Sequence, residues 1–335
     1  GKPTAVHIWQ RQRFLRPTFI LLHVTLTVVS KTNSKITEFL MIVALACAAA
    51  SSGYGDEKIS RGNFVARKQA DGFQLRLLCW NVRANSIFSP DGARRDSFQR
   101  IVKAVAPDVI CLQEVFDPLG GKTLELKRLV EACIALPGGG SWSVHSASDN
   151  VVLSRYPLAH GRSELIVPFP LPRFRDFQYG HAMCLVDVPD DVCDRDFYVV
   201  GMHNKSRGGE ANVRMRQRQS DSIVGAIRDM RQLGDESPIA DRTPILIVGD
   251  MNVLAVEPAD PALHLTTLLT GNIVDEEAFG ADFPLDWDGS HLVEAKPRHN
   301  SREKEFYTWR EDSTPFPPGA LDRIIYTDSV LVLNH

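Results

Sequence analysis

The strongest constraint on the fold is an apolar run that ends in a polar motif, Pro244-Ile-Leu-Ile-Val-Gly-Asp-Met-Asn252. Such a run, rich in β-branched residues, is typical of a strand that is buried on both faces. Because side chains alternate along a strand, Asp250 and Asn252 are expected to project to the same side. A lone Gly-Asp-x-Asn is equally typical of a strand that ends in a simple turn, so its interpretation depends on the rest of the chain.

The same pattern recurs in four other apolar runs, each of which carries polar residues near one end. These runs are 75–82 with Asn81, 108–115 with Gln113 and Glu114, 197–205 with His203, Asn204 and Lys205, and 321–326 with Asp322. Buried carboxylates are tolerated only when they are paired or bound to a metal. The sequence therefore predicts that these polar residues share a cleft at one edge of the sheets.

Helical patterns separate the predicted strands. Apolar residues recur at helical spacing over 94–106, 124–136 and 211–233, which predicts three amphipathic helices. The runs 182–188 and 197–203 are joined by a polar turn and predict an antiparallel hairpin. Periodicity alone therefore indicates a mixed α/β fold and no more specific architecture.

Six motifs in a fixed order carry a family resemblance. They are Trp80-Asn81, Leu112-Gln-Glu114, the segment 150–157, Met202-His-Asn-Lys-Ser206, Gly249-Asp-Met-Asn252 and Leu321-Asp-Arg-Ile-Ile325. Together they resemble the endonuclease/exonuclease/phosphatase superfamily, whose fold is that of deoxyribonuclease I, over roughly residues 72–335. The resemblance implies a four-layer α/β sandwich, in which helices flank two packed mixed β-sheets.

The resemblance also implies an activity and a cofactor. Members are metal-dependent phosphoesterases that hydrolyse a phosphodiester or phosphomonoester by in-line attack of water. Matched by motif, Glu114 and Asn81 are expected to hold Mg²⁺ or Mn²⁺, since oxygen ligands suit a hard cation. The substrate class stays open between nucleic acid, a phospholipid head group and a sugar phosphate.

The catalytic roles follow from the same match. Asp250 is expected to polarise the attacking water, Asn252 to position it, and His203 to contact the phosphate near neutral pH. Asp322 is expected to orient a second histidine. The residues predicted to bind phosphate after His203 are Asn204, Lys205 and Arg207.

One family feature is missing from these 335 residues, namely a C-terminal Ser-Asp-His whose histidine is a principal catalytic base. The domain 72–335 is therefore expected to lack its C-terminal end, including a strand whose absence would leave a sheet edge unpaired. We expect the chain to bind metal and phosphate but to hydrolyse diesters slowly, and a longer form to be faster. The alternative is a non-catalytic, phosphate-binding relative.

The N-terminal part has a different composition. Residues 1–55 are expected to be an extension, in which 38–50 resembles a secretory signal cleaved near Ala50, and 56–71 a linker. The apolar run 19–29 is too short to span a membrane. This predicts a secreted or periplasmic protein, which we expect to be a monomer.

Charge and cysteine content add two open alternatives. A net charge of −3 argues against a general nucleic-acid coat protein, although Lys205, Arg207, Arg214, Arg216 and Arg218 cluster after His203. This cluster predicts either a solvated helix face or a surface that faces phosphate. Among the six cysteines, Cys79 and Cys111 are predicted to be buried thiols, whereas Cys184 and Cys193 flank a loop and could pair in an oxidising compartment.

Overall fold

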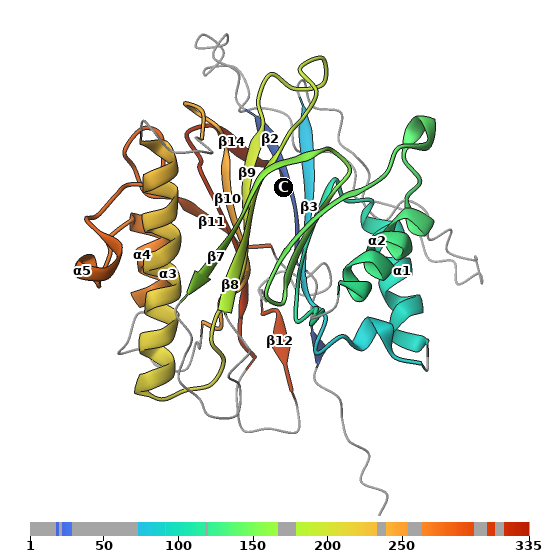
Figure 1. The fold of residues 1–335 in the computed structure, drawn as a ribbon, viewed down its shortest axis with the longest axis horizontal. Helices are drawn as coiled ribbons and strands as arrows, with labels where there is room; N and C mark the ends of the chain where they lie inside the picture. Colours follow the sequence, from blue (N-terminus) through green and yellow to red (C-terminus); the bar gives the residue numbers. More distant parts are fainter. Residues whose placement is uncertain are drawn as a thin grey trace, which may run out of the picture.

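Two six-stranded β-sheets pack face to face, and helices cover both outer sides (Figure 1). Helices α1 (Ala93–Val105) and α2 (Gly121–Cys133) lie on one side, and α3 (Glu210–Arg231), α4 (Leu263–Thr270) and α5 (Glu276–Phe279) lie on the other. This confirms the predicted four-layer sandwich. The computed structural model describes residues 18–19, 22–28, 73–90, 92–117, 120–166, 179–232, 239–253, 263–297, 307–311 and 318–334.

The first sheet has the strand order β11-β13-β10-β9-β8-β7. Its strands are β7 (Leu158–Ile166), β8 (Tyr179–Val186), β9 (Phe197–His203), β10 (Ile245–Asp250), β11 (Val293–Ala295) and β13 (Asp322–Tyr326). Strand β10 runs parallel to β9 and antiparallel to β13. Strands β8 and β9 are antiparallel neighbours, which confirms the predicted hairpin.

The second sheet has the strand order β14-β2-β3-β4-β6-β5. Its strands are β2 (Leu22–Val28), β3 (Gln74–Asn81), β4 (Val109–Gln113), β5 (Ser143–Ala147), β6 (Asn150–Ser154) and β14 (Leu331–Asn334). Strands β3 and β4 are parallel, whereas β2 is antiparallel to both of its neighbours. Two short strands, β1 (Thr18–Phe19) and β12 (Trp309–Arg310), pair separately, and the short helices η1 (Ser86–Phe88) and η2 (Pro137–Gly139) complete the elements.

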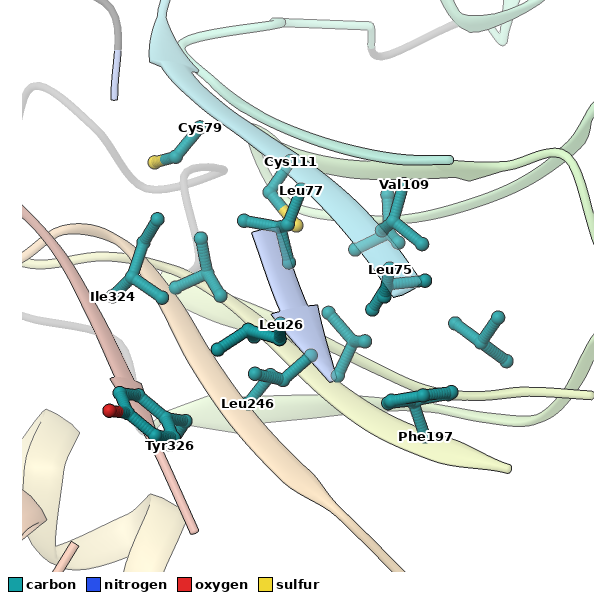
Figure 2. Packing of buried hydrophobic residues seen from close by; sticks show 14 of the residues in the cluster. Leu26, Leu75, Leu77, Cys79, Val109, Cys111, Phe197, Leu246, Ile324 and Tyr326 are labelled. Carbon is teal, nitrogen blue, oxygen red and sulfur yellow. The ribbon is translucent and has the colours of Figure 1, made fainter. Parts of the chain in front are cut away.

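The central core lies between the two sheets and is built from alternate residues of their strands (Figure 2). In β3 the residues that face it are Leu75, Leu77 and Cys79, and in β10 they are Leu246 and Val248. The intervening residue Leu78 packs instead with the helices on the outer side. Because the strand repeat is two residues, the polar residues at the strand ends continue the face that points between the sheets.

The helices are held by their apolar faces, as their periodicity predicts. In α3, Ile223, Val224, Ile227 and Met230 are fully buried against strands of the first sheet. In α1, Phe98 and Val102 are fully buried against the second sheet. The predicted helix boundaries differ from the structure by one to three residues, which is the usual uncertainty at helix ends.

The N-terminal segment differs from the prediction. Residues 1–55 are expected to be an extension outside the domain, but residues 22–28 form strand β2, which pairs with β3 and β14. Its Leu26 is fully buried in the central core. The sequence Leu-His-Val-Thr-Leu-Thr-Val alternates apolar and polar residues at the strand repeat, a pattern that the sequence analysis did not interpret as a strand. The predicted signal segment 38–50 and linker 56–71 lie outside the described residues.

The cysteines in the described part of the chain are all free. Cys79, Cys111 and Cys184 are fully buried, and Cys193 is nearly so. The two buried thiols predicted in the core strands are thereby confirmed, and the pairing of Cys184 with Cys193 is not formed.

No helix in the described part of the chain is long and apolar enough to cross a membrane.

Candidate active site at the ends of both sheets

Six polar side chains from both sheets meet at one end of the sandwich. The second sheet contributes Asn81, Glu114 and Asp149, and the first contributes His203, Asp250 and Asp322. The ends of neighbouring strands bring them together, since Asp250 is the register partner of both His203 and Asp322. The structure thus brings together five of the six predicted catalytic and metal-binding residues. The sixth, Asn252, follows two positions after Asp250 and donates its backbone N–H to Asp250 Oδ1.

Asn81 links the two sheets. Its Nδ2 donates hydrogen bonds to Glu114 Oε1 at 3.0 Å and to Asp250 Oδ2 at 3.0 Å. Its Oδ1 accepts a hydrogen bond from the backbone N–H of Arg83 at 2.9 Å. The amide is therefore fully engaged within the site, and it holds two carboxylates from different sheets beside each other.

Glu114 follows directly after β4 in a left-handed backbone conformation, with φ 62°. This conformation is uncommon for a residue other than glycine and is often found at functional sites. Its Oε2 accepts a hydrogen bond from the backbone N–H of Ala84 at 2.6 Å. Asn85 supports the turn, because its side chain exchanges two hydrogen bonds with the backbone of Phe116. The carboxylate is thus fixed by the loops that follow β3 and β4.

His203 ends β9 and is held from the opposite sheet. Its Nδ1 lies 2.7 Å from Asp149 Oδ2, and its Nε2 lies 4.0 Å from Asp250 Oδ2. Asp149 is almost fully buried in the turn between β5 and β6. We did not predict it, because Ser-Ala-Ser-Asp-Asn is typical of any turn. The only available signal was its place directly before the motif 150–157.

The charge of His203 is set by its surroundings. Burial alone would lower the pKa of its imidazole, but the carboxylates of Asp149, Asp250 and Glu114 outweigh burial and raise the pKa to about 10. The imidazole therefore carries a proton on both nitrogens at neutral pH. Since Nδ1 is used by Asp149 and the 4.0 Å gap to Asp250 exceeds a hydrogen bond, the Nε2 proton is available to a ligand oxygen.

Asp250 stands at the end of β10 and requires the glycine before it. At Gly249 the φ angle is 154°, and an added Cβ would lie 1.8 Å from the carbonyl oxygen of Met202 on β9. The Asp250 side chain accepts hydrogen bonds from Asn81 and, at Oδ1, from the backbone N–H of Asn252 at 2.9 Å. Burial raises the pKa of Asp250, although His203 opposes this. Its carboxylate is therefore a stronger base than an exposed one.

Asp322 lies opposite Asp250 at the start of β13. Burial, followed by the charge of Asp250, raises the pKa of Asp322 to about 8. Thr308 Oγ1 accepts the backbone N–H of Asp322 at 2.9 Å. Among the described residues, Asp322 Oδ1 has no hydrogen-bond partner. Two buried carboxylates side by side would repel each other, so at least one of the two groups resists ionisation.

Comparison with known proteins decides the family. The sequence profile described as the Endonuclease/Exonuclease/phosphatase family matches residues 78–335. The chain belongs to the endonuclease/exonuclease/phosphatase family. No curated protein matches the chain in a sequence comparison.

Solved structures with the same fold are distant in sequence. A beta toxin from Staphylococcus aureus shares 18% identity over 76% of this chain and 85% of its own, with a TM-score of 0.50. Sphingomyelinase C from Streptomyces griseocarneus shares 17% over 76% and 84%, with a TM-score of 0.48. A variant of the S. aureus beta toxin with bound magnesium ions shares 16% over 75% and 83%, with a TM-score of 0.48.

The three residues predicted to bind phosphate differ in their exposure to solvent. Asn204 is fully buried, and its Nδ2 donates to the carbonyl oxygen of Met251 at 3.3 Å, so it supports the floor of the site instead of facing a substrate. Its own carbonyl oxygen accepts the Nδ2 of Asn252 at 2.9 Å. Lys205 is half-buried and Arg207 is exposed, and both lie on the loop after His203.

The basic cluster after His203 is divided between helix α3 and the loop that follows β9. Arg214 pairs with Glu210 within α3, and Arg218 pairs with Asp275. Arg216 is only 4% exposed and contacts the backbone of the loop. Only Lys205 and Arg207 in this set are positioned on the loop next to His203.

The acidic side chains of the site fit a hard cation in chemistry. Glu114, Asp250 and Asp322 lie around one histidine, and burial together with mutual repulsion raises the pKa of Asp250 and Asp322. A divalent cation would relieve that repulsion, and such ions take one or two carboxylates and complete their shell with water. The described residues contain no group of three or more His, Cys, Asp and Glu side chains arranged around a common ion. Glu114 is the carboxylate suited to the role, whereas Asn81 presents its nitrogen and acts as a bridge.

Proposed function

We propose that this chain is a metal-dependent phosphoesterase that hydrolyses a phosphodiester or phosphomonoester by in-line attack of water. The observation that carries the proposal is the position of His203, whose Nδ1 lies 2.7 Å from Asp149 Oδ2 and whose Nε2 lies 4.0 Å from Asp250 Oδ2. The surrounding carboxylates raise the pKa of the imidazole to about 10, which favours the protonated ring at neutral pH. A proton donor next to a basic carboxylate is the pair of groups that phosphoryl transfer to water needs.

Each residue is assigned a role from its contacts. His203 donates its Nε2 proton to a phosphoryl oxygen and stabilises the charge that develops there. Asp250 has a raised pKa, and it accepts a hydrogen bond from the attacking water and draws the water's proton. Asn252 is placed two residues beyond to position that water. Asp322 has a free acceptor oxygen among the described residues, which suits the orientation of a second histidine.

Glu114 is the proposed ligand of a divalent cation, Mg²⁺ or Mn²⁺, which when bound would neutralise charge on the phosphoryl oxygens. Calorimetric titration with Mg²⁺ or Mn²⁺ should lose its binding signal in Glu114→Ala. The exposed Glu277→Ala on α5 is the control and should bind as the unaltered protein does. Equal affinity in both variants would remove Glu114 from the site.

The activity is tested by hydrolysis of bis-p-nitrophenyl phosphate, with Mg²⁺ and with a chelator. We expect slow hydrolysis that the chelator abolishes and that His203→Asn lowers by about 10²-fold or more, since general acid catalysis contributes about 10²–10⁴-fold. The exposed His291→Asn should retain the original rate. Metal-dependent phosphate binding without hydrolysis would instead support a non-catalytic relative, and hydrolysis indifferent to both chelator and His203 would contradict the proposal.

The substrate class and the location of the protein are proposed from the family and the sequence. The substrate is a phosphoester of a nucleic acid, a phospholipid head group or a sugar phosphate, and the protein acts as a secreted or periplasmic monomer. A panel of these three substrate classes, assayed with Mg²⁺, separates them. Equal rates on all three would show that the chain does not select among them.

A further inference from the structure

The loop from His203 to Arg207 leaves the first sheet at the site and carries three charged side chains. The backbone N–H of Asn204 still bonds to Asp250 at 2.8 Å, as a last contact with β10. Beyond this point the sheet no longer supports the chain. Arg207 adopts a left-handed conformation with φ 74°, so this loop needs support from elsewhere to keep a single geometry.

Helix α3 supplies that support through Gln219, which is fully buried. Gln219 Nε2 donates to the carbonyl oxygen of His203 at 3.1 Å, and Gln219 Oε1 accepts the backbone N–H of Lys205 at 2.7 Å. One side-chain amide thus joins the backbone groups on both sides of Asn204. It replaces the pairing that a neighbouring strand would have provided.

Arg216 lies one turn earlier on the same helix and is 4% exposed. Its NH1 donates to the carbonyl oxygens of Lys205 at 2.9 Å and of Arg207 at 2.8 Å. The two side chains are three residues apart and therefore lie on one face of α3. Together they make four hydrogen bonds to the backbone of the loop.

We propose that Gln219 and Arg216 are positioning residues, which fix the backbone of the loop 203–207 and thereby set His203 against Asp149 and Lys205 beside the substrate. This rests on the proposed function. The 2.7 Å contact between His203 and Asp149 comes from opposite sheets, so a shift of the loop backbone lengthens it directly. A displacement of 1 Å at a reacting group can cost about 10²-fold in rate.

The same helix provides a matched control. Gln217 is also buried, at 8% exposure, and its Nε2 bonds to Asp221 and to Thr267 on α4, both at 2.8 Å. Among the described residues no hydrogen bond joins Gln217 to the loop that carries His203; one of its bonds lies within α3 and the other joins α3 to α4. Gln217→Met and Gln219→Met remove the same polar group and keep similar volume, so both should lower thermal stability to a comparable extent.

The experiment compares the two variants in the full chain by two measurements. The first is kcat and KM for bis-p-nitrophenyl phosphate with Mg²⁺. The second is the low-field NMR signal of the His203 Nδ1 proton, which reports its hydrogen bond to Asp149. We expect Gln219→Met to lower kcat by roughly 10–100-fold and to shift or broaden the signal, whereas Gln217→Met changes neither.

Arg216→Lys distinguishes the contribution of Arg216 from that of Gln219. A lysine keeps the charge, but its ammonium ends one bond short of the position of Arg216 NH1, which donates to both oxygens. The carbonyl oxygens of Lys205 and Arg207 therefore lose their shared partner. We expect a raised KM with a smaller change in kcat, because the part of the loop that it frees lies beyond His203. A fall in kcat as large as that of Gln219→Met would contradict this division.

The positioning role is overturned if Gln219→Met and Gln217→Met lose kcat equally and the Nδ1 signal is unchanged. If the unaltered protein hydrolyses nothing, the proposed function fails, but the Nδ1 signal still decides the positioning role. If Gln219→Met does not fold, Gln219→Glu serves in its place. It keeps the acceptor for Lys205 but removes the donor to His203, so the signal should still move.

Discussion

Asp149 determines the charge state of the histidine at the centre of the site. It reaches His203 across the gap between the sheets at 2.7 Å, and its charge is the first of those that raise the pKa of the imidazole. Burial by itself favours the neutral ring. The residue that was least visible in the sequence therefore makes the first contribution to keeping His203 protonated at neutral pH.

Asp149→Asn should lower the pKa of His203 from about 10, because Asp149 is the first of the charges that oppose the effect of burial. The raised pKa stabilises the fold fully below pH about 6.5, and this stabilisation is lost as the pH rises toward 10. NMR titration of the imidazole nitrogens measures the midpoint. The exposed Asp229→Asn on α3 should leave it in place, and an unchanged midpoint in Asp149→Asn would disprove the pairing.

Asp322→Asn should stabilise the protein at alkaline pH. The pKa of Asp322 is raised to about 8, so the unfolded chain ionises this group more readily than the folded one between pH about 4 and 8. The unaltered protein loses stability across that window, and the amide variant does not. Thermal unfolding at pH 6 and pH 9 should show a Tm advantage that grows with pH, by about 2 °C for each kcal/mol gained. A constant difference would contradict the raised pKa.

At the scale of elements, the sequence predicts the strands whose ends carry the site residues, but it does not predict all the residues that contact those ends. Apolar runs that end in Asn81, Glu114, His203 and Asp250 locate the ends of β3, β4, β9 and β10 to within two residues. The alternation of the strands then explains why these ends face one another. The roles of Asp149, Arg216 and Gln219 depend on the register between elements that are distant in the sequence, which local patterns do not contain.

Gly249→Ala should disrupt the junction of β9 and β10 and the site with it. An added Cβ would lie 1.8 Å from the carbonyl oxygen of Met202, and the backbone conformation suits only glycine. We expect a loss of several kcal/mol in the free energy of unfolding, measured by urea denaturation. Gly121→Ala at the start of α2 is the control, since nothing lies within 4 Å of its added Cβ. Similar midpoints for the two variants would argue against the close approach of the strands.

At the scale of the whole molecule, the second sheet joins segments from both parts of the chain. Strand β2 separates β3 from β14 and hydrogen-bonds to both, and Leu26 fills part of the core between the sheets. The predicted cleavage near Ala50 would remove this strand. A mature chain that starts after Ala50 therefore cannot form the sheet described here. N-terminal sequencing of the exported protein distinguishes the two possibilities.

Leu26→Ala should lower the free energy of unfolding by about 2–5 kcal/mol, the usual range for a fully buried leucine. A chain starting at Ser51 should be destabilised further, because β3 and β14 would each have an unpaired edge. Thermal unfolding measures both. Leu124→Ala, at 48% exposure, serves as the surface control. If both altered chains melt at the original temperature, β2 does not belong to the sheet.

The position of β2 has a consequence for synthesis on the ribosome. Leu331 pairs with Val28, roughly 300 residues earlier, and at about 5–20 residues per second this interval takes on the order of 15–60 s. During that time β2 and β3 can form a ribbon, but its outer edge has no partner until β14 emerges. A nascent chain whose strand edge stays unpaired for so long is exposed to pairing with other chains and to aggregation.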